Sequence, residues 1–379
     1  MSLSTIICIL LSASVVLVAV SPHCSEESIF KQNFERELNG KSLKDAFEAS
    51  NDVLGEGSFG VVKSIPWIDQ NGNLITVAVK KVTSWYPKRN KILAQEIDTM
   101  IQFKGNQYII NFLGCMVITE KKMDIREING DLRYTEMEVN TVYIVSEKLY
   151  ADFSPKGLAS EFKILPLLDR LEGYLSFAQG LKVMHDKHYI HGDIMPANIM
   201  ATDSSLKHIK LIDLEAARQF GDSLRDATLF YRPKEYFSTA KAHPSIDIYS
   251  FGVSVAVMEF AIETFIYKVT PSTPKSEVPE LISSAIKLYL PNKTGLKYSQ
   301  TEENIVSIVL DCIKTEANER PTTDKLIVRL TKAIEVAKRG KNSSLLGPQK
   351  LEQQNSAVLE TTDIEKRSSS SGVTSYVLI

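Results

Sequence analysis

The sequence predicts an α+β fold in which a β-rich first part is followed by a larger helical part. Two observations support this prediction. The first third of the chain alternates short apolar runs with turn residues, and after Tyr150 the apolar residues recur in long runs of helical spacing. A length of 379 residues fits one large two-lobed domain or two separate domains.

The overall composition excludes several classes of protein. The chain has 44 Lys and Arg residues against 46 Asp and Glu, so its formal net charge of −2 provides no positive field to attract nucleic acid. Four cysteines are too few for a disulfide-stapled scaffold. The hydrophobic share of 44% is that of an ordinary globular protein, which leaves an enzyme and a binding module open.

The N-terminal segment differs from the rest of the chain. No charged residue occurs before Glu26, and Ile6 to Val20 is almost continuously apolar. As a helix this run spans about 22 Å, short of the ~30 Å hydrocarbon core of a bilayer. The length favours a secretory leader within residues 1–22 over an uncleaved membrane anchor, and both over a buried helix. The absence of Lys and Arg from the segment and the poor cleavage site around Ala19 argue against the leader.

The folded part is expected from about Leu43 to Ala337, followed by a disordered tail over residues 338–379 that is rich in Gln, Ser and Thr. The charged stretch from Thr119 to Asn140 is predicted to be a solvated loop. Cys115 and Cys312 lie in apolar runs and are expected to be buried without forming a disulfide with each other. The periodicity predicts strands over 53–66, 74–82, 109–118 and 142–145, and helices over 91–103, 167–185, 246–262 and 303–314.

A glycine-rich segment lies between two predicted strand runs. Residues 55–62 read Gly-Glu-Gly-Ser-Phe-Gly-Val-Val, a G-x-G-x-x-G-x-V pattern whose backbone N–H groups can bind an anionic ligand. A dinucleotide-binding fold requires a helix directly after such glycines. Here the strand pattern continues through Val61 to Pro66, which excludes that interpretation.

The next motif is Val77-Ala78-Val79-Lys80, followed by Glu96 on a predicted helix. At this point the sequence resembles the eukaryotic-like protein kinase family, in which a strand Lys holds the nucleotide phosphates and pairs with a helix Glu. The resemblance continues in chain order over most of the folded part. The further matching segments are Val142 to Leu149, His191 to Asn198, Leu211 to Glu215, Thr228 to Glu235, Ile246 to Gly252 and Asn318 to Thr322.

The resemblance implies a bilobal protein kinase-like fold, with a β-rich N-lobe over residues 43–147 and a helical C-lobe over residues 150–337. It implies that Lys80, Glu96 and Asp193 are catalytic, with Asp193 orienting the substrate hydroxyl and accepting its proton. It implies that Asn198 and Asp213 bind Mg²⁺ through oxygen atoms.

The resemblance also assigns a nucleotide site and a structural frame. Asp247 is expected to anchor the catalytic loop, and Glu235 and Arg320 to form an ion pair that braces the C-lobe. Glu147 and Leu149 would offer backbone groups to adenine. The residues expected to bind ATP are Leu54, Gly55, Gly57, Ser58, Gly60, Val62, Ala78, Lys80, Glu147 and Leu149.

Four positions depart from the family pattern. Gly192 replaces the Arg that receives an activation-loop phosphate, so switching by that phosphate is not expected. Leu214 and Glu215 replace Phe and Gly, and Glu215 adds a negative charge beside Asp213. Met195 replaces a Lys that stabilises the transferred phosphoryl group, and such a loss costs about 10²–10³ in rate.

The function implied by the resemblance is transfer of the ATP γ-phosphoryl group to a protein, with Mg²⁺ as cofactor. Thr228 before Tyr231 favours Ser/Thr over Tyr as the acceptor. Met195 and Glu215 support an alternative, a nucleotide-binding pseudokinase that acts by docking. The expected partners are ATP and a protein substrate, without nucleic acid, and a membrane only if the N-terminal segment is an anchor. The expected location is the secretory route, or alternatively a membrane anchor with the kinase domain in the cytosol.

Overall fold

The computed structural model describes residues 43–57, 60–69, 72–84, 87–128, 131–154, 156–225, 227–260, 273–292 and 300–345. The predicted leader or anchor over residues 1–22, Ser58 of the glycine-rich segment, and residues 346–379 of the predicted tail lie outside the described residues. Among the helices in these ranges, none combines the length and the apolar character needed to cross a membrane.

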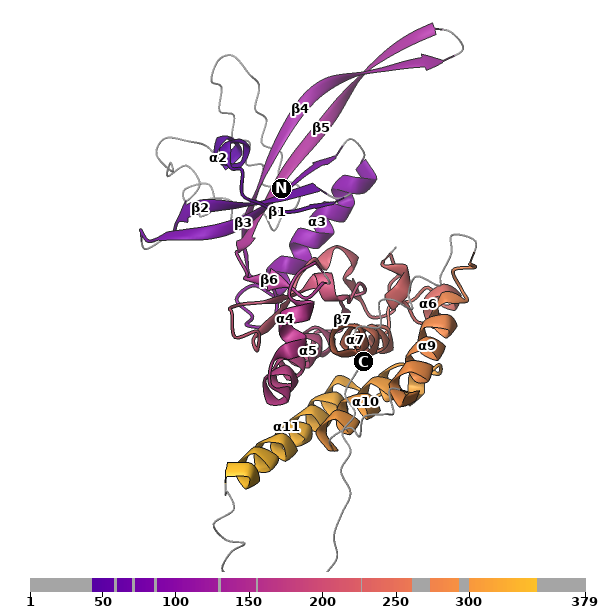
Figure 1. Cartoon of the computed structure of the whole chain (residues 1–379). Helices are drawn as coiled ribbons and strands as arrows, with labels where there is room; N and C mark the ends of the chain where they lie inside the picture. Colours follow the sequence, from indigo (N-terminus) through magenta and orange to yellow (C-terminus); the bar gives the residue numbers. More distant parts are fainter. Residues whose placement is uncertain are drawn as a thin grey trace, which may run out of the picture. The chain divides into compact units, whose positions relative to one another are not determined.

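The N-terminal part is a five-stranded antiparallel sheet with one long helix (Figure 1). The strand order is β1-β2-β3-β5-β4, and the helix α3 (Pro87–Gln102) connects β3 to the edge strand β4. This arrangement confirms the predicted β-rich N-lobe. The strands are β1 (Val53–Gly57), β2 (Gly60–Ile68), β3 (Leu74–Ser84), β4 (Phe112–Ile128) and β5 (Asp131–Glu147).

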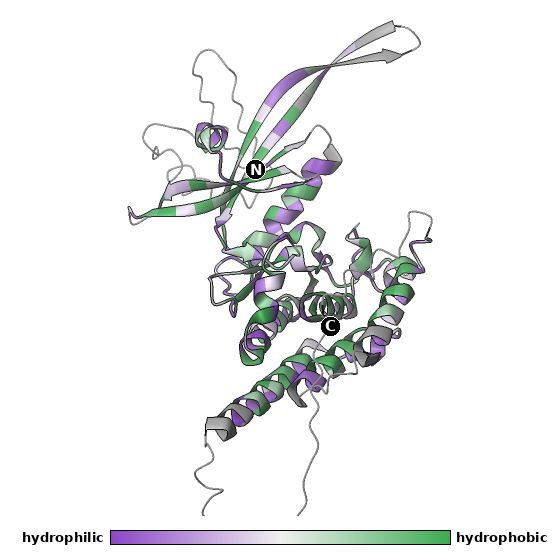
Figure 2. Ribbon diagram, viewed as in Figure 1, coloured by the Kyte–Doolittle hydropathy of each residue, from purple (hydrophilic) through white to green (hydrophobic). Residues whose placement is uncertain are grey.

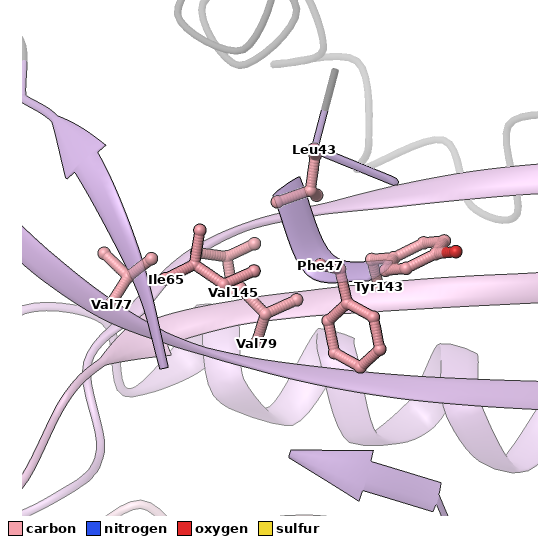
Figure 3. Packing of buried hydrophobic residues seen from close by; sticks show 7 residues of the cluster. All are labelled: Leu43, Phe47, Ile65, Val77, Val79, Tyr143 and Val145. Carbon is pink, nitrogen blue, oxygen red and sulfur yellow. The ribbon is translucent and has the colours of Figure 1, made fainter. Parts of the chain in front are cut away.

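A short helix, α2 (Leu43–Ala49), covers one face of this sheet (Figure 3). Its Leu43 and Phe47 pack into an apolar cluster with Ile65, Val77, Val79, Tyr143 and Val145 from three strands. The rings of Phe47 and Tyr143 meet edge to face at 5.5 Å. Because successive side chains of a strand point to opposite faces, burial of Val77 and Val79 under α2 turns Ala78 and Lys80 to the other face. The cluster therefore fixes the direction of Lys80.

The predicted solvated loop between Thr119 and Asn140 was wrong. Both β4 and β5 are 17 residues long and remain paired from Cys115 opposite Ile144 out to Ile128 opposite Asp131. Thr119 is buried at the base of this extension and donates from Oγ1 to Oδ1 of Asn140 at 2.6 Å. Each strand satisfies the backbone groups of the other, so the charged side chains that suggested a loop can remain in water. Figure 2 shows these hydrophilic segments along the hairpin.

The C-terminal part is mainly helical, which confirms the predicted C-lobe and the α+β class. Helix α7 (Pro244–Phe260) is buried on nearly all sides, as expected for a helix that is apolar all round. The rings of Phe177 and Phe251 join it to α5 at 4.5 Å. Within the residues that the structure describes, the other helices of four or more residues in this part are α4 (Ala159–Ile164), α5 (Leu167–Asp186), α6 (Glu235–Ser238), α9 (Val278–Asn292), α10 (Gln300–Cys312) and α11 (Thr323–Leu345).

Short strands and turns connect the two parts and form the loops of the site. Strands β6, β8 and β9 make one small sheet, and β7 pairs with β10 in another. The strands are β6 (Ala151–Asp152), β7 (Tyr189–Ile190), β8 (Ile199–Ala201), β9 (Ile209–Leu211) and β10 (Arg218–Gln219). The short 3-10 helices are η2 (Pro196–Asn198), η3 (Leu214–Ala216), η4 (Leu229–Tyr231) and η5 (Ala317–Glu319).

The folded part extends beyond its predicted C-terminal boundary at Ala337. Helix α11 continues through Lys338 to Leu345, so the first part of the predicted disordered tail is helical. Lys and Arg are good helix formers, and a charged composition does not by itself end a helix. Cys312 is fully buried in α10 as expected, whereas Cys115 on β4 is only partly buried, and the two form no disulfide with each other. Burial raises the pKa of the Cys312 thiol to about 12.

Candidate active site

Lys80 contacts two carboxylates that come from distant parts of the chain. The Nζ atom of Lys80 on β3 lies 2.8 Å from Oε1 of Glu96 on α3 and 3.4 Å from Oδ1 of Asp213. Burial alone would lower the pKa of Lys80, but the charges of Glu96 and Asp213 outweigh it and raise the pKa above its usual value. Lys80 therefore carries its full positive charge at neutral pH.

The loop between β7 and η2 presents the Asp193 carboxylate. Its Oδ2 accepts a hydrogen bond from Nδ2 of Asn198 at 3.2 Å, and its Oδ1 accepts one from the backbone N–H of Thr228 at 2.7 Å. Both oxygen atoms are thus oriented by neighbours on two sides, the first turn after the loop and the segment before η4. The carboxylate is held in one position before any substrate binds.

His191 connects the Asp193 loop to the segment that carries Asp213. Its Nε2 lies 2.8 Å from the carbonyl oxygen of Ile212, which can only accept, so Nε2 carries the proton. Its Nδ1 is then the acceptor for the backbone N–H of Asp193 at 3.4 Å. The imidazole thereby links Asp193 and Asp213 through one buried ring.

Asp247 on α7 anchors the loop that carries Asp193, as the sequence predicted. The carboxylate is fully buried. Its Oδ1 accepts from the backbone N–H of Gly192 at 2.9 Å, and its Oδ2 accepts from the backbone N–H of His191 at 2.8 Å and from Nε2 of His185 at 2.9 Å. Three donors compensate the buried charge, and two of them are backbone groups directly before Asp193.

Gly192 takes a conformation that suits glycine alone. Its φ is +81°, and a Cβ at this position would lie 2.8 Å from the carbonyl oxygen of Ala216. The family's Arg is therefore replaced by a residue that fits a close approach between the Asp193 loop and η3.

Asn198 and Asp213 have the chemistry to bind a magnesium ion. Asn198 uses its Nδ2 to bind the backbone oxygen and the carboxylate of Asp193, which leaves its amide Oδ1 for a cation. The Asp213 side chain is 35% exposed and offers a carboxylate. These hard oxygen atoms fit Mg²⁺, which retains water and binds phosphates. Within the described ranges no cluster of three or more His, Cys, Asp or Glu residues is placed to hold a metal.

The glycine-rich segment forms the β1–β2 hairpin, and strand β2 follows it, as the sequence predicted. Gly57 pairs with Gly60 next to the turn. Gly60 has a φ of +137°, and a Cβ there would lie 2.2 Å from the carbonyl oxygen of Lys81, so the hairpin can approach β3 only at a glycine. Val62 lies opposite Lys80 in the β2–β3 pairing. Leu54 and Gly55 are exposed on β1.

The predicted adenine-binding residues Glu147 and Leu149 lie at the end of β5 and just after it. The backbone N–H of Glu147 donates to the carbonyl oxygen of Asn111 at 3.1 Å. The carboxylate of Glu147 accepts from Nζ of Lys210 at 2.5 Å and from the backbone N–H of Asn111 at 2.7 Å, so it is bound to β9 and to the start of β4. Leu149 is buried, and its backbone groups form no hydrogen bond to other residues that the structure describes. Ala78 lies opposite Ser146 in the β3–β5 pairing.

Two of the four departures from the family pattern, Met195 and Glu215, make side-chain contacts in the structure. Met195 is half-buried, and its Sδ lies 3.1 Å from Oγ1 of Thr228. Glu215 accepts two hydrogen bonds from the guanidinium of Arg89, at 2.6 and 3.0 Å. Arg89 was not identified as a functional residue from the sequence. Arg89 lies before the predicted helix over 91–103 and 126 positions before Glu215 in the chain, so no local pattern pointed to it.

The predicted ion pair of the C-lobe is present. Arg320 donates from Nη1 and Nη2 to the two oxygens of Glu235, at 2.5 and 3.1 Å. The guanidinium also donates to the backbone oxygens of Lys314, Thr315 and Ser245. This ion pair ties the end of the segment after η4 to the loop before α11.

Comparison with known proteins assigns this fold and site to a family. The family model for protein tyrosine and serine/threonine kinases matches residues 49–330. The chain belongs to this family of protein kinases.

Individual relatives are distant. The chain is 30% identical over 167 residues to a MAP kinase kinase of Schizosaccharomyces pombe (skh1/pek1), an alignment that covers 42% of this chain and 44% of that protein. It is 24% identical over 303 residues to a probable receptor-like protein kinase of Arabidopsis thaliana, covering 76% and 78%. It is 22% identical over 341 residues to a MAP kinase kinase of Saccharomyces cerevisiae, covering 83% and 60%. Two of these three relatives are therefore matched over less than two thirds of their length.

Proposed function

We propose that the protein is an active kinase that transfers the γ-phosphoryl group of ATP to serine or threonine hydroxyls of a protein. The observation that carries the proposal is the meeting of Lys80 with Glu96 and Asp213, at 2.8 and 3.4 Å. Phosphoryl transfer depends mainly on positioning and on neutralising negative charge, and this cluster supplies a fixed cation beside a carboxylate suited to Mg²⁺.

We assign the roles of the residues from their contacts together with the chemistry of phosphoryl transfer. The charged Lys80 binds the α- and β-phosphates and is itself oriented by Glu96. Asp193 orients the acceptor hydroxyl and accepts its proton, with its carboxylate held by Asn198 and Thr228. Asn198 and Asp213 would hold Mg²⁺, which when bound supplies charge neutralisation at the phosphates. The backbone of Leu149 binds adenine.

Support for Ser/Thr specificity comes from Thr228. Its backbone N–H orients Asp193 and its hydroxyl contacts Met195, so this segment lies directly beside the group that accepts the substrate proton. The family model covers both tyrosine and serine/threonine kinases. Phosphoamino-acid analysis of a phosphorylated mixed-sequence peptide library separates the two, and phosphotyrosine as the main product would contradict the proposal.

The activity is tested with radiolabelled ATP and a general protein substrate such as casein. Label transfer by the purified chain is expected to fall to background in Asp193→Asn, which removes the proton acceptor, and in Lys80→Met, which removes the phosphate-binding cation. Asp324→Asn, an exposed carboxylate on α11, serves as the control and should retain the wild-type rate. Equal label in wild type and both site variants would rule out this kinase activity.

A pseudokinase that binds ATP without transferring phosphate is the second candidate, and Met195 is the observation that favours it. The position beside Asp193 that would stabilise the transferred group holds a thioether next to Thr228. Thermal unfolding with ATP, with and without Mg²⁺, separates the candidates. A ligand at 100 times its Kd adds about 2.7 kcal/mol. An active kinase should be stabilised more by ATP with Mg²⁺ than by ATP alone, whereas equal shifts without turnover would favour the pseudokinase.

We propose that the chain enters the secretory route through its charge-free N-terminal segment, with an anchor that leaves the kinase domain in the cytosol as the alternative. The support is the uninterrupted lack of charge before Glu26. N-terminal sequencing of the protein from a eukaryotic host tests this. Cleavage near residue 22 supports the leader, and an intact N-terminus in a membrane fraction supports the anchor.

A further inference from the structure

An ion pair joins the beginning of α3 to the turn that follows Asp213. Arg89 in the first turn of α3 donates from Nη1 to Oε1 and from Nη2 to Oε2 of Glu215, at 2.6 and 3.0 Å. The two side chains are 19% and 16% exposed. Parallel bonds between a guanidinium and a carboxylate are among the strong and directional contacts in proteins, and partial burial protects this one from screening by salt.

A second contact fixes the same turn to the middle of α3. Arg225 donates from Nη1 to the backbone oxygen of Glu215 at 2.9 Å and from Nη2 to Oε1 of Gln95. Gln95 is adjacent to Glu96 in the helix. The η3 turn therefore holds α3 at its beginning through Arg89 and beside Glu96 through Arg225.

The position of α3 decides whether Glu96 can reach Lys80. Glu96 is almost fully buried, and its Oε1 lies 2.8 Å from Nζ of Lys80. Its second oxygen, Oε2, accepts no hydrogen bond from the residues that the structure describes. Burying a carboxylate with one oxygen unsatisfied is unfavourable, so the inward position of α3 needs stabilisation from elsewhere. The contacts of Glu215 provide it.

The same region contains no side chain at Gly192 to bind a phosphate on the segment between Asp213 and Glu235. Glu215 places a permanent negative charge where it binds a cation of α3 directly. The carboxylate of Glu215 thus binds an arginine in place of a phosphate, which in other proteins orders such a segment through arginine contacts.

We propose that Glu215 and Arg89 are positioning residues that hold α3 and the Lys80–Glu96 pair in the transfer-competent arrangement, so that the kinase does not depend on phosphorylation of residues 213–235. The statement about phosphoryl transfer rests on the proposed function. The statement about the position of α3 does not, because the position of this helix is measurable without turnover.

The test uses the full chain and two single variants, Glu215→Gln and Arg89→Gln, which remove one charge each; the first keeps the shape of the side chain, and the second shortens it. Hydrogen exchange of the α3 backbone amides, followed by mass spectrometry, is expected to speed up about tenfold in both, because the helix separates from η3 more often. The double variant Arg89→Glu with Glu215→Arg, which restores the pair in reverse, is expected to return exchange toward the wild-type rate. The control is Glu136→Gln, which removes a carboxylate from the exposed pair with Lys121 on the β4–β5 hairpin.

Activity gives the second readout. In the two single variants kcat/KM for ATP is expected to fall at least about tenfold, with recovery in the double variant. Phosphatase treatment of the wild type should change neither activity nor α3 exchange. Unchanged α3 exchange in both single variants, no recovery in the double variant, or loss of activity after phosphatase treatment would each overturn the proposal. If the wild type shows no transfer but α3 exchange responds as expected, the positioning role stands and the kinase assignment fails.

Discussion

Met195→Lys is expected to raise the rate of phosphoryl transfer about 100-fold or more. A lysine here places an ammonium group beside Asp193, where negative charge develops on the transferred phosphoryl, and one such group is worth about 10²–10³ in rate. Met195 is half-buried with extended backbone, and lysine has a straight side chain of similar length. Thr228, whose Oγ1 now contacts the thioether at 3.1 Å, can accept from the new ammonium.

The rate is measured with saturating ATP and Mg²⁺ on a fixed peptide substrate. Met123→Lys makes the same chemical change at an exposed position of the β4–β5 hairpin and should leave the rate unchanged. A large gain in Met195→Lys alone shows that the rest of the machinery is in place. A rate no higher than in the Met123→Lys control would mean that another group already supplies this charge, or that a different feature limits transfer.

The elements that the sequence predicted well are those in which local pattern and burial agree. Val77 to Val82 alternates between two environments, and the structure places Val77 and Val79 under α2 with Lys80 on the opposite face. The hairpin extension was missed because a two-stranded ribbon buries little of its surface. Its backbone pairing continues to Ile128, yet its exposed side chains have the composition of a loop.

Local sequence patterns also identified only some of the residues of the site. Motif order located Lys80, Glu96 and Asp213 because their spacing is tied to strands and a helix. The partners of Glu215 and Glu147 were not located, since Arg89 is 126 residues from Glu215 and Lys210 is 63 residues from Glu147. Such pairs depend on how the parts of the fold pack, and no local pattern encodes them. The sequence therefore showed Glu215 as an added negative charge, whereas the structure was needed to show that the guanidinium of Arg89 compensates it.

Asp247→Ala is expected to lower the free energy of unfolding by about 3–5 kcal/mol, because it leaves buried donors without their acceptor. The carboxylate is fully buried and binds the backbone N–H groups of His191 and Gly192 as well as Nε2 of His185. Removing it leaves two backbone donors unsatisfied at the base of the Asp193 loop and an imidazole without its partner. Asp247→Asn should also be destabilising, since its amide hydrogens would face donors.

Urea denaturation of the two variants and the wild type measures the effect. The matched control is Asp324→Ala, which removes a carboxylate that is 70% exposed and pairs with Lys182 at 2.8 Å; an exposed pair of this kind contributes about 0–1 kcal/mol. A loss in Asp247→Ala no larger than in Asp324→Ala would show that the loop holds its shape without the buried carboxylate. The expected large difference would instead show that the stability of the fold depends on this buried carboxylate, which lies 54 positions (247 − 193) from Asp193 in the chain and binds the two residues before it.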